Sequence, residues 1–144
     1  MGGRIENKLI FWDIDGTLLH CGDDGRRALN RAFFQLYGVE DAFAAANIGG
    51  AMDHAILTGI LAAIGAGPEE LPKVEAAYGE ALWTVLGEDR KKRVLPGVEA
   101  LLSAIHQAPG THNALLTSNL RLGSALKLSS LGLEKWFLPE SLLN

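Results

Sequence analysis

The sequence has 144 residues, which is enough for one domain or for one domain with an inserted segment. Its composition, 48% apolar and 21% charged, is ordinary for a soluble globular protein, and its net charge of −4 argues against nucleic acid as a partner. The single cysteine, Cys21, excludes an internal disulfide and favours a reducing, cytoplasmic location. Because the start has no signal-peptide layout and no apolar run is long enough to cross a bilayer, we expect no membrane partner.

A short apolar run at residues 9–12 has the content of a buried strand and leads directly into two aspartates, Asp13 and Asp15, before Gly16 interrupts it. Because side chains alternate along a strand, both aspartates are expected on the same side. Two neighbouring carboxylates repel each other unless a cation or a shared proton relieves them. At the carboxyl end of a parallel strand they would lie where open α/β sheets bind ligands, so this stretch predicts a site.

Two simpler interpretations of this stretch are less favourable. An Asp-Gly pair often only forms a turn, but a D-x-D-G-T segment directly after an apolar strand is rarely just that. An EF-hand calcium loop would require glycine at its sixth position and glutamate at its twelfth, where this chain has Leu18 and Asp24.

Residues 26–87 are expected to form a helical block after the first strand. Apolar spacing predicts helices at 26–37, 54–64 and 73–86, with Asp53 as the N-cap of the second. A short helical region at 68–70 should be separated from the third helix by Pro72. The charged run that follows, at 88–93, is expected to be a solvated linker and not a nucleic-acid patch.

The remainder of the chain alternates between helices and strands. A helix is expected after Pro96-Gly97, a strand at 113–119, a helix at 121–131 and the start of a third strand at 136–138. This alternation implies right-handed parallel crossovers, and therefore the α/β class.

The second strand ends in three small polar residues, Thr117, Ser118 and Asn119. If the two strands are parallel neighbours, these residues lie close to Asp13 and Asp15. A hydroxyl and backbone N–H groups at a helix start suit an anionic oxygen ligand such as phosphate. Carboxylates repel phosphate, so a divalent cation is needed between them, and an oxygen-only site favours Mg²⁺. One aspartate could then attack phosphorus to give an aspartyl-phosphate, while the other transfers protons.

Several segments carry a resemblance to the haloacid dehalogenase (HAD) superfamily. The stretch F-W-D-I-D-G-T-L-L resembles its first motif in the phosphatase form D-x-D-G-T, and L-L-T-S-N resembles its second. The helical block has the position of the cap in phosphoglycolate-phosphatase-like members. The loop 49–53 is similar to their substrate-selecting cap loop, 94–98 to the Pro-Gly turn where the chain re-enters the core, and 119–137 to their helix and G-L-x-x-x-F ending.

The resemblance implies an incomplete Rossmann-like parallel sheet formed by residues 1–20 and 94–144, with a helical cap of residues 21–93. It implies Asp13 as nucleophile and Mg²⁺ ligand, and Asp15 as general acid and base with its backbone carbonyl on Mg²⁺. Thr117 would hold the phosphoryl group, and the rest of the implied substrate-binding set is Gly16, Ser118 and Asn119.

The implied activity is removal of phosphate from a small phosphorylated metabolite. A dehalogenase is disfavoured by Asp15, because a halide leaving group needs no proton.

Two further motifs of the family have no match after Phe137, namely a lysine and an acidic segment, often G-D-x-x-x-D. Lys127 and Lys135 are expected to be solvated residues on helix surfaces. The chain therefore resembles an N-terminal portion, and the alternative hypothesis is a truncated, catalytically inactive fragment or interaction module. The missing strands would leave an apolar sheet edge unpaired, which invites pairing with another chain.

Overall fold

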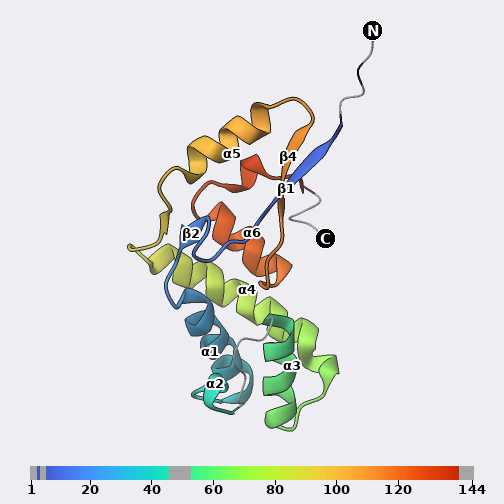
Figure 1. Ribbon diagram of the computed structural model, residues 1–144. Coiled ribbons are helices and arrows are strands. Elements are labelled where there is room, and N and C mark those ends of the chain that lie inside the picture. The colour runs from blue at the N-terminus through green and yellow to red at the C-terminus, as the bar shows by residue number, and fades with distance from the viewer. Residues whose placement is uncertain (1–2, 4–5, 46–52, 140–144) are drawn as a thin grey trace.

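The computed structural model describes residue 3, residues 6–45 and residues 53–139. Two parallel strands, β1 (Lys8–Trp12) and β4 (Thr111–Leu115), pair in register from Lys8 opposite Thr111 to Trp12 opposite Leu115. Although the two strands are neighbours in space, a long stretch of chain separates them in sequence (Figure 1). This arrangement confirms the predicted α/β class with a small parallel sheet.

The other elements follow in chain order. After β1 come β2 (Leu19–His20), α1 (Asp24–Tyr37), α2 (Ala42–Ala45), α3 (Asp53–Ala63), η1 (Pro68–Glu70) and α4 (Leu71–Glu88). The chain then forms β3 (Arg93–Val94), α5 (Val98–Gln107), β4, α6 (Arg121–Ser129) and η2 (Glu134–Trp136).

A buried asparagine links the parallel pair to the helices beside it. The side-chain carbonyl of Asn113 in β4 accepts a hydrogen bond from the indole Nε1 of Trp12 at 2.9 Å. Its amide nitrogen donates to the carbonyl oxygens of Leu102 and Trp136, each at 3.0 Å. Because Asn113 is almost fully buried, these three bonds satisfy polar groups that have no access to water, and they fix β1, α5 and η2 around one point.

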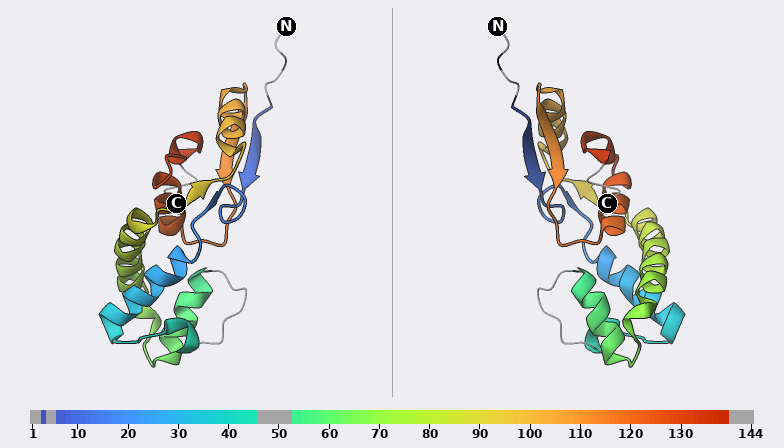
Figure 2. Two further views of the ribbon diagram at one scale, coloured as in Figure 1. Left: turned by 90° about the vertical axis from the view of Figure 1, so that its left-hand side faces the viewer. Right: turned by 90° about the vertical axis from the view of Figure 1, so that its right-hand side faces the viewer.

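The first four α-helices form a block beyond the carboxyl ends of β1 and β4, and α1 and α4 run together through it (Figures 1 and 2). Fully buried side chains of these helices, including Phe33 and Leu82, belong to one continuous apolar core that also contains Ile14 and Leu128. The block therefore shares its core with the strand ends and with α6. None of the helices in the described part of the chain is long and apolar enough to span a membrane.

Both connections between the sheet and the helical block pass through a second strand pair. Strands β2 and β3 are antiparallel, with Leu19 opposite Val94 and His20 opposite Arg93. The N–H of Leu95 donates to the carbonyl of Leu18 at 2.9 Å and continues the pairing. The sequence predicts only a solvated linker at 88–93 and no strand pair, because two-residue strands are too short to show an alternating pattern.

Several predicted boundaries shift in the structure. The expected strand at 113–119 begins two residues earlier and ends at Leu115, so Thr117, Ser118 and Asn119 follow the strand and are not part of it. The expected third strand at 136–138 is reduced to one bridge between Phe137 and Asn113, after the turn η2. The predicted cap loop at 49–53 lies outside the described residues except for Asp53.

The outer strand β1 has large exposed apolar side chains. Leu9 is 49% exposed and Phe11 57%, and Leu116, just after β4, is 70% exposed. Among the described residues β1 pairs only with β4, and it lies at the margin of the molecule in both views of Figure 2. The predicted unpaired apolar edge is present in this part of the chain.

Candidate active site

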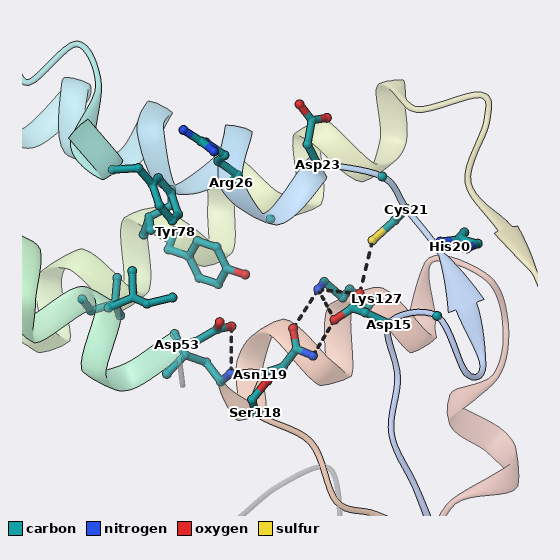
Figure 3. A pocket seen from close by; sticks show the side chains of 18 residues that line it. Asp15, His20, Cys21, Asp23, Arg26, Asp53, Tyr78, Ser118, Asn119 and Lys127 are labelled. Atoms are coloured by element: carbon teal, nitrogen blue, oxygen red, sulfur yellow. Dashed lines mark hydrogen bonds and ion pairs between the residues drawn. The ribbon is translucent and has the colours of Figure 1, made fainter. Parts of the chain in front are cut away.

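A pocket of about 490 Å³ lies where the sheet meets the helical block (Figure 3). Its polar end comes from the segments that follow β1 and β4 and from α6, and its other end from α1 to α4. Of the residues predicted for the site, it brings together Asp15, Gly16, Ser118 and Asn119.

Asp15 is the centre of a hydrogen-bond network at the polar end. Its two carboxylate oxygens lie 2.9 and 3.0 Å from the ammonium nitrogen of Lys127. One of them also accepts a hydrogen bond from the amide of Asn119 at 2.8 Å. The segments after the two parallel strands are thus joined directly through Asp15 and Asn119. The sequence predicts this closeness, because neighbouring parallel strands have their carboxyl ends side by side.

Lys127 is not the solvated helix-surface residue that the sequence predicts. It lies in α6 but is only 6% exposed, and its ammonium group donates to the side-chain oxygen of Asn119 at 2.7 Å as well as to Asp15. A buried lysine requires an opposite charge and hydrogen-bond acceptors, and this one has both. The spacing of α6 does not set Lys127 apart, because its buried face also carries Gly123 and Ser124, which are not apolar.

Opposing effects act on the carboxyl group of Asp15. Burial raises its pKa, but the charge of Lys127 and the hydrogen bonds from Asn119 and Lys127 together outweigh burial and lower the pKa below its ordinary value. The thiol of Cys21 lies 3.8 Å from the same carboxylate, and burial raises the pKa of Cys21 to about 11. The thiol is therefore protonated at neutral pH and is a poor nucleophile.

Thr117 orients Asn119 at the polar end of the pocket. Its hydroxyl oxygen accepts hydrogen bonds from the backbone N–H of Asn119 at 3.2 Å and from the Asn119 amide at 2.8 Å. These bonds hold the turn between β4 and α6 and direct Asn119 toward Asp15. Ser118 is exposed and lines the pocket.

Asp13 occupies a different environment from Asp15. It is exposed, directly after the last residue of β1, and its carboxylate accepts a hydrogen bond from the N–H of Ile14 at 2.8 Å. It is not among the described residues that line the pocket. Between the aspartates Ile14 is fully buried, and Gly16 has a positive φ of 79°, a conformation that glycine adopts without strain.

Asp53 joins the helical block to the site. It was predicted to cap its own helix, but it is the first residue of α3, and its carboxylate accepts a hydrogen bond from the N–H of Leu120 at 3.3 Å. Its own N–H donates to the carbonyl of Ser118 at 3.2 Å. Burial raises the pKa of Asp53, while the Leu120 N–H and the charge of Lys127 oppose that effect.

Tyr78 of α4 extends from the helical block toward the polar end. Its ring is 4% exposed, and Figure 3 shows its hydroxyl directed toward Lys127. Two glycines leave room for it: a Cβ at Gly25 would lie 3.8 Å from the hydroxyl, and one at Gly123 only 3.2 Å. Burial, followed by the charges of Asp53 and Asp15, raises the pKa of Tyr78, so the hydroxyl stays neutral and can donate a hydrogen bond.

The described residues contain no cluster of three or more His, Cys, Asp or Glu side chains that could hold a metal ion. The donors at the end of β1 are all oxygens, however, and Mg²⁺ is commonly held by one or two carboxylates with water and substrate phosphate completing its shell. The exposed carboxylate of Asp13 fits such a site, whereas the carboxylate of Asp15 is already occupied by Lys127 and Asn119.

No protein-family model matches the chain, and no curated protein is significantly similar to it in sequence. Solved structures do share its fold. CbbY from Rhodobacter sphaeroides, solved in complex with phosphate, is 20% identical with a TM-score of 0.62 over 91% of this chain and 61% of the other. A protein from Haemophilus somnus 129PT, described as a predicted phosphoglycolate phosphatase, is 20% identical with a TM-score of 0.54 over 99% of this chain and 67% of the other.

A further protein with that predicted activity, from Lactobacillus plantarum, is 20% identical with a TM-score of 0.50 over 92% of this chain and 59% of the other. The chain thus spans about three fifths to two thirds of the length of these structures.

Proposed function

Because the chain has the fold of HAD-type phosphatases, we propose that it hydrolyses a small phosphorylated metabolite through an aspartyl-phosphate intermediate. The observation that carries this proposal is the buried Lys127 at the polar end of the pocket, in contact with Asp15 and Asn119. The sequence resemblance lacked a lysine for the phosphoryl group, and Lys127 supplies a positive charge at the site from an unexpected helix.

In the proposed reaction the carboxylate of Asp13 attacks phosphorus, and the bond from phosphorus to the ester oxygen breaks. Asp15 gives its proton to the departing oxygen, and later removes a proton from the water that hydrolyses the aspartyl-phosphate. Thr117, with Gly16, Ser118 and Asn119, would hold the phosphoryl group.

The contact between Asp15 and Lys127 has a consequence for this scheme. A low pKa keeps Asp15 ionised in the free protein, whereas the first step needs it protonated. A phosphoryl dianion that drew Lys127 toward itself would remove the cation that lowers the pKa and add a negative charge that raises it. Substrate binding is therefore expected to bring Asp15 its proton.

Mg²⁺ would be held by the carboxylate of Asp13 and the backbone carbonyl of Asp15, with phosphate oxygen and water as further ligands. When bound, it would offset the repulsion between the carboxylates and the phosphoryl group.

The test is phosphate release from para-nitrophenyl phosphate with and without Mg²⁺. We expect Mg²⁺-dependent release that Asp13→Asn lowers to background, while Asp41→Asn, at an exposed aspartate that does not line the pocket, leaves it unchanged. If the purified protein has the circular dichroism of a folded α/β chain and releases no phosphate, the inactive fragment or interaction module is the better interpretation.

A further inference from the structure

We propose that the pocket selects phosphate esters whose organic group is apolar, such as an aryl or branched alkyl group, in preference to polyhydroxylated ones. This inference rests on the phosphatase function proposed above and concerns the part of the pocket that the phosphoryl group would not fill. The structure points to it through the division of the pocket into a polar end and an apolar end.

The pocket is larger than the volume of a phosphate ester with a very small organic group. Its volume of about 490 Å³ falls within the range of cavities that enclose drug-sized ligands. At the polar end of the pocket Asp15, Asn119 and Lys127 contact one another. The rest of the pocket is lined mainly by residues of α1 to α4 and is available to the organic part of a substrate.

Apolar side chains from three helices of the block line that space. Leu29 comes from α1, Phe43 from α2, and Ile56 and Leu57 from α3. Leu29 and Leu57 are almost fully buried, so they form a fixed wall.

Among the described residues of α1 to α4, the polar side chains that line the pocket are Arg26, Asp53 and Tyr78, and each has a contact with another part of the protein. Arg26 has its guanidinium carbon 4.7 Å from the centre of the Phe43 ring, which is a cation–π contact. Asp53 is bonded to Leu120 across the junction. The hydroxyl of Tyr78 is directed toward Lys127, at the boundary between the polar and apolar ends (Figure 3).

A polyhydroxylated organic group would lose hydrogen bonds to water when it packs against this apolar wall and would regain few from the protein, which is unfavourable. An apolar group has no hydrogen bonds to lose, and its binding is favoured because apolar surface is removed from water. Differences of one small apolar group in such pockets change kcat/KM by about 10- to 200-fold.

The experiment compares benzyl phosphate with glycerol 1-phosphate, because the leaving group of each is a primary alcohol and so the two esters differ little in intrinsic reactivity. With the full chain and Mg²⁺, we expect kcat/KM for benzyl phosphate to be roughly tenfold or more above that for glycerol 1-phosphate. Binding of benzylphosphonate, which has no ester bond to cleave, is measured alongside by calorimetry.

Ile56→Asn is expected to abolish the preference for the benzyl ester by adding a polar group to the wall. Ile64→Asn is the matched control, since Ile64 is also half-buried and follows the same helix but does not line the pocket, and it should leave the preference unchanged. Benzylphosphonate binding to the unaltered protein tests the pocket even if Ile56→Asn fails to fold.

The outcomes separate this inference from the proposed function. Phosphate release with equal or greater preference for glycerol 1-phosphate would overturn the inference and leave the phosphatase function standing. Benzylphosphonate binding that Ile56→Asn weakens, without phosphate release from either ester, would support the apolar selectivity and overturn the phosphatase function. If the protein neither binds benzylphosphonate nor releases phosphate, both the inference and the proposed function are overturned.

Discussion

At the scale of single residues, the contact between Lys127 and Asp15 decides what the polar end of the pocket can do. The sequence predicted the aspartates and the residues after the second strand from motif and position, and the structure brings Asp15 and Asn119 into contact. The burial of Lys127 could not be predicted from the sequence, because a lysine on a helix is usually solvated. Only the packing of α6 shows that its ammonium group faces inward.

Replacing Lys127 by methionine retains a flexible chain of similar length and removes its charge. We expect Lys127→Met to lower kcat/KM for phosphate release by about 100-fold or more, because a preorganised donor for the phosphoryl group is lost. The pKa of Asp15 should also rise, because the cation that lowers it is gone and burial then dominates. Steady-state kinetics measures the first effect, and carboxyl NMR titration the second.

The matched control is Lys135→Met. Lys135 has an exposed side chain that pairs with Glu99, far from the pocket lining, so its replacement should leave both quantities unchanged. An unchanged kcat/KM in Lys127→Met would remove Lys127 from the proposed reaction.

At the scale of elements, the start of α1 and the end of α4 meet at a pair of carboxyl groups. Asp24 is the first residue of α1 and is almost fully buried, while Asp89 directly follows α4. Burial, with a hydrogen bond and a negative charge from Asp89, raises the pKa of Asp24 to about 7, and only Arg27, at 3.6 Å, opposes this. The shared proton also lowers the pKa of Asp89.

The pH dependence of folding follows from this pair. Since the pKa of Asp24 in the folded state is above its ordinary value of 3.8, the folded protein holds more protons than the unfolded chain at intermediate pH. The stability that Asp24 contributes is fully present below about pH 4 and is lost as the pH rises through about 7.

Asp24→Asn should therefore flatten the decline in the free energy of unfolding between about pH 5 and about pH 8. Urea denaturation at several pH values measures this decline. The control that should keep it is Asp41→Asn, at an exposed aspartate that is not among the groups that shift the pKa of Asp24. The same slope in the wild type and in Asp24→Asn would show that the pair does not control it.

At the scale of the whole molecule, the parallel pair has an uncovered side. Leu9, Phe11 and Leu116 together present apolar surface on and beside a strand whose outer edge has no partner among the described residues. Exposed apolar strands of this kind readily pair with other chains.

We expect Phe11→Lys to reduce self-association of the protein, because a charge on an edge strand disfavours pairing. Sedimentation velocity over a range of concentrations measures the effect. Phe34→Lys is the control: Phe34 is 59% exposed on α1, away from the sheet, and its replacement should leave association unchanged. Equal association of the wild type and Phe11→Lys would exclude this strand as the contact.

Much of the fold followed from the sequence, because long amphipathic helices and apolar strands have periodic patterns. The helices at 24–37, 71–88 and 98–107 and both parallel strands are found close to their predicted positions. The short pair β2–β3 and the role of Asp53 could not be predicted, because both depend on contacts between segments far apart in the sequence. The proposed roles of Asp13, Asp15 and Thr117 stay predictions that the kinetic experiments address.

The β2–β3 pair brings the two ends of the helical block next to each other. Because His20 lies opposite Arg93, the chain leaves and re-enters the sheet side at neighbouring positions of one small ladder. Antiparallel neighbours can be joined by a turn of about two residues, so the ladder could be closed by Asn-Gly in place of the block without a change of register. The same junction would equally accept an insert of another size, so protein engineers could graft a different lid at this point and keep the residues that follow β1 and β4.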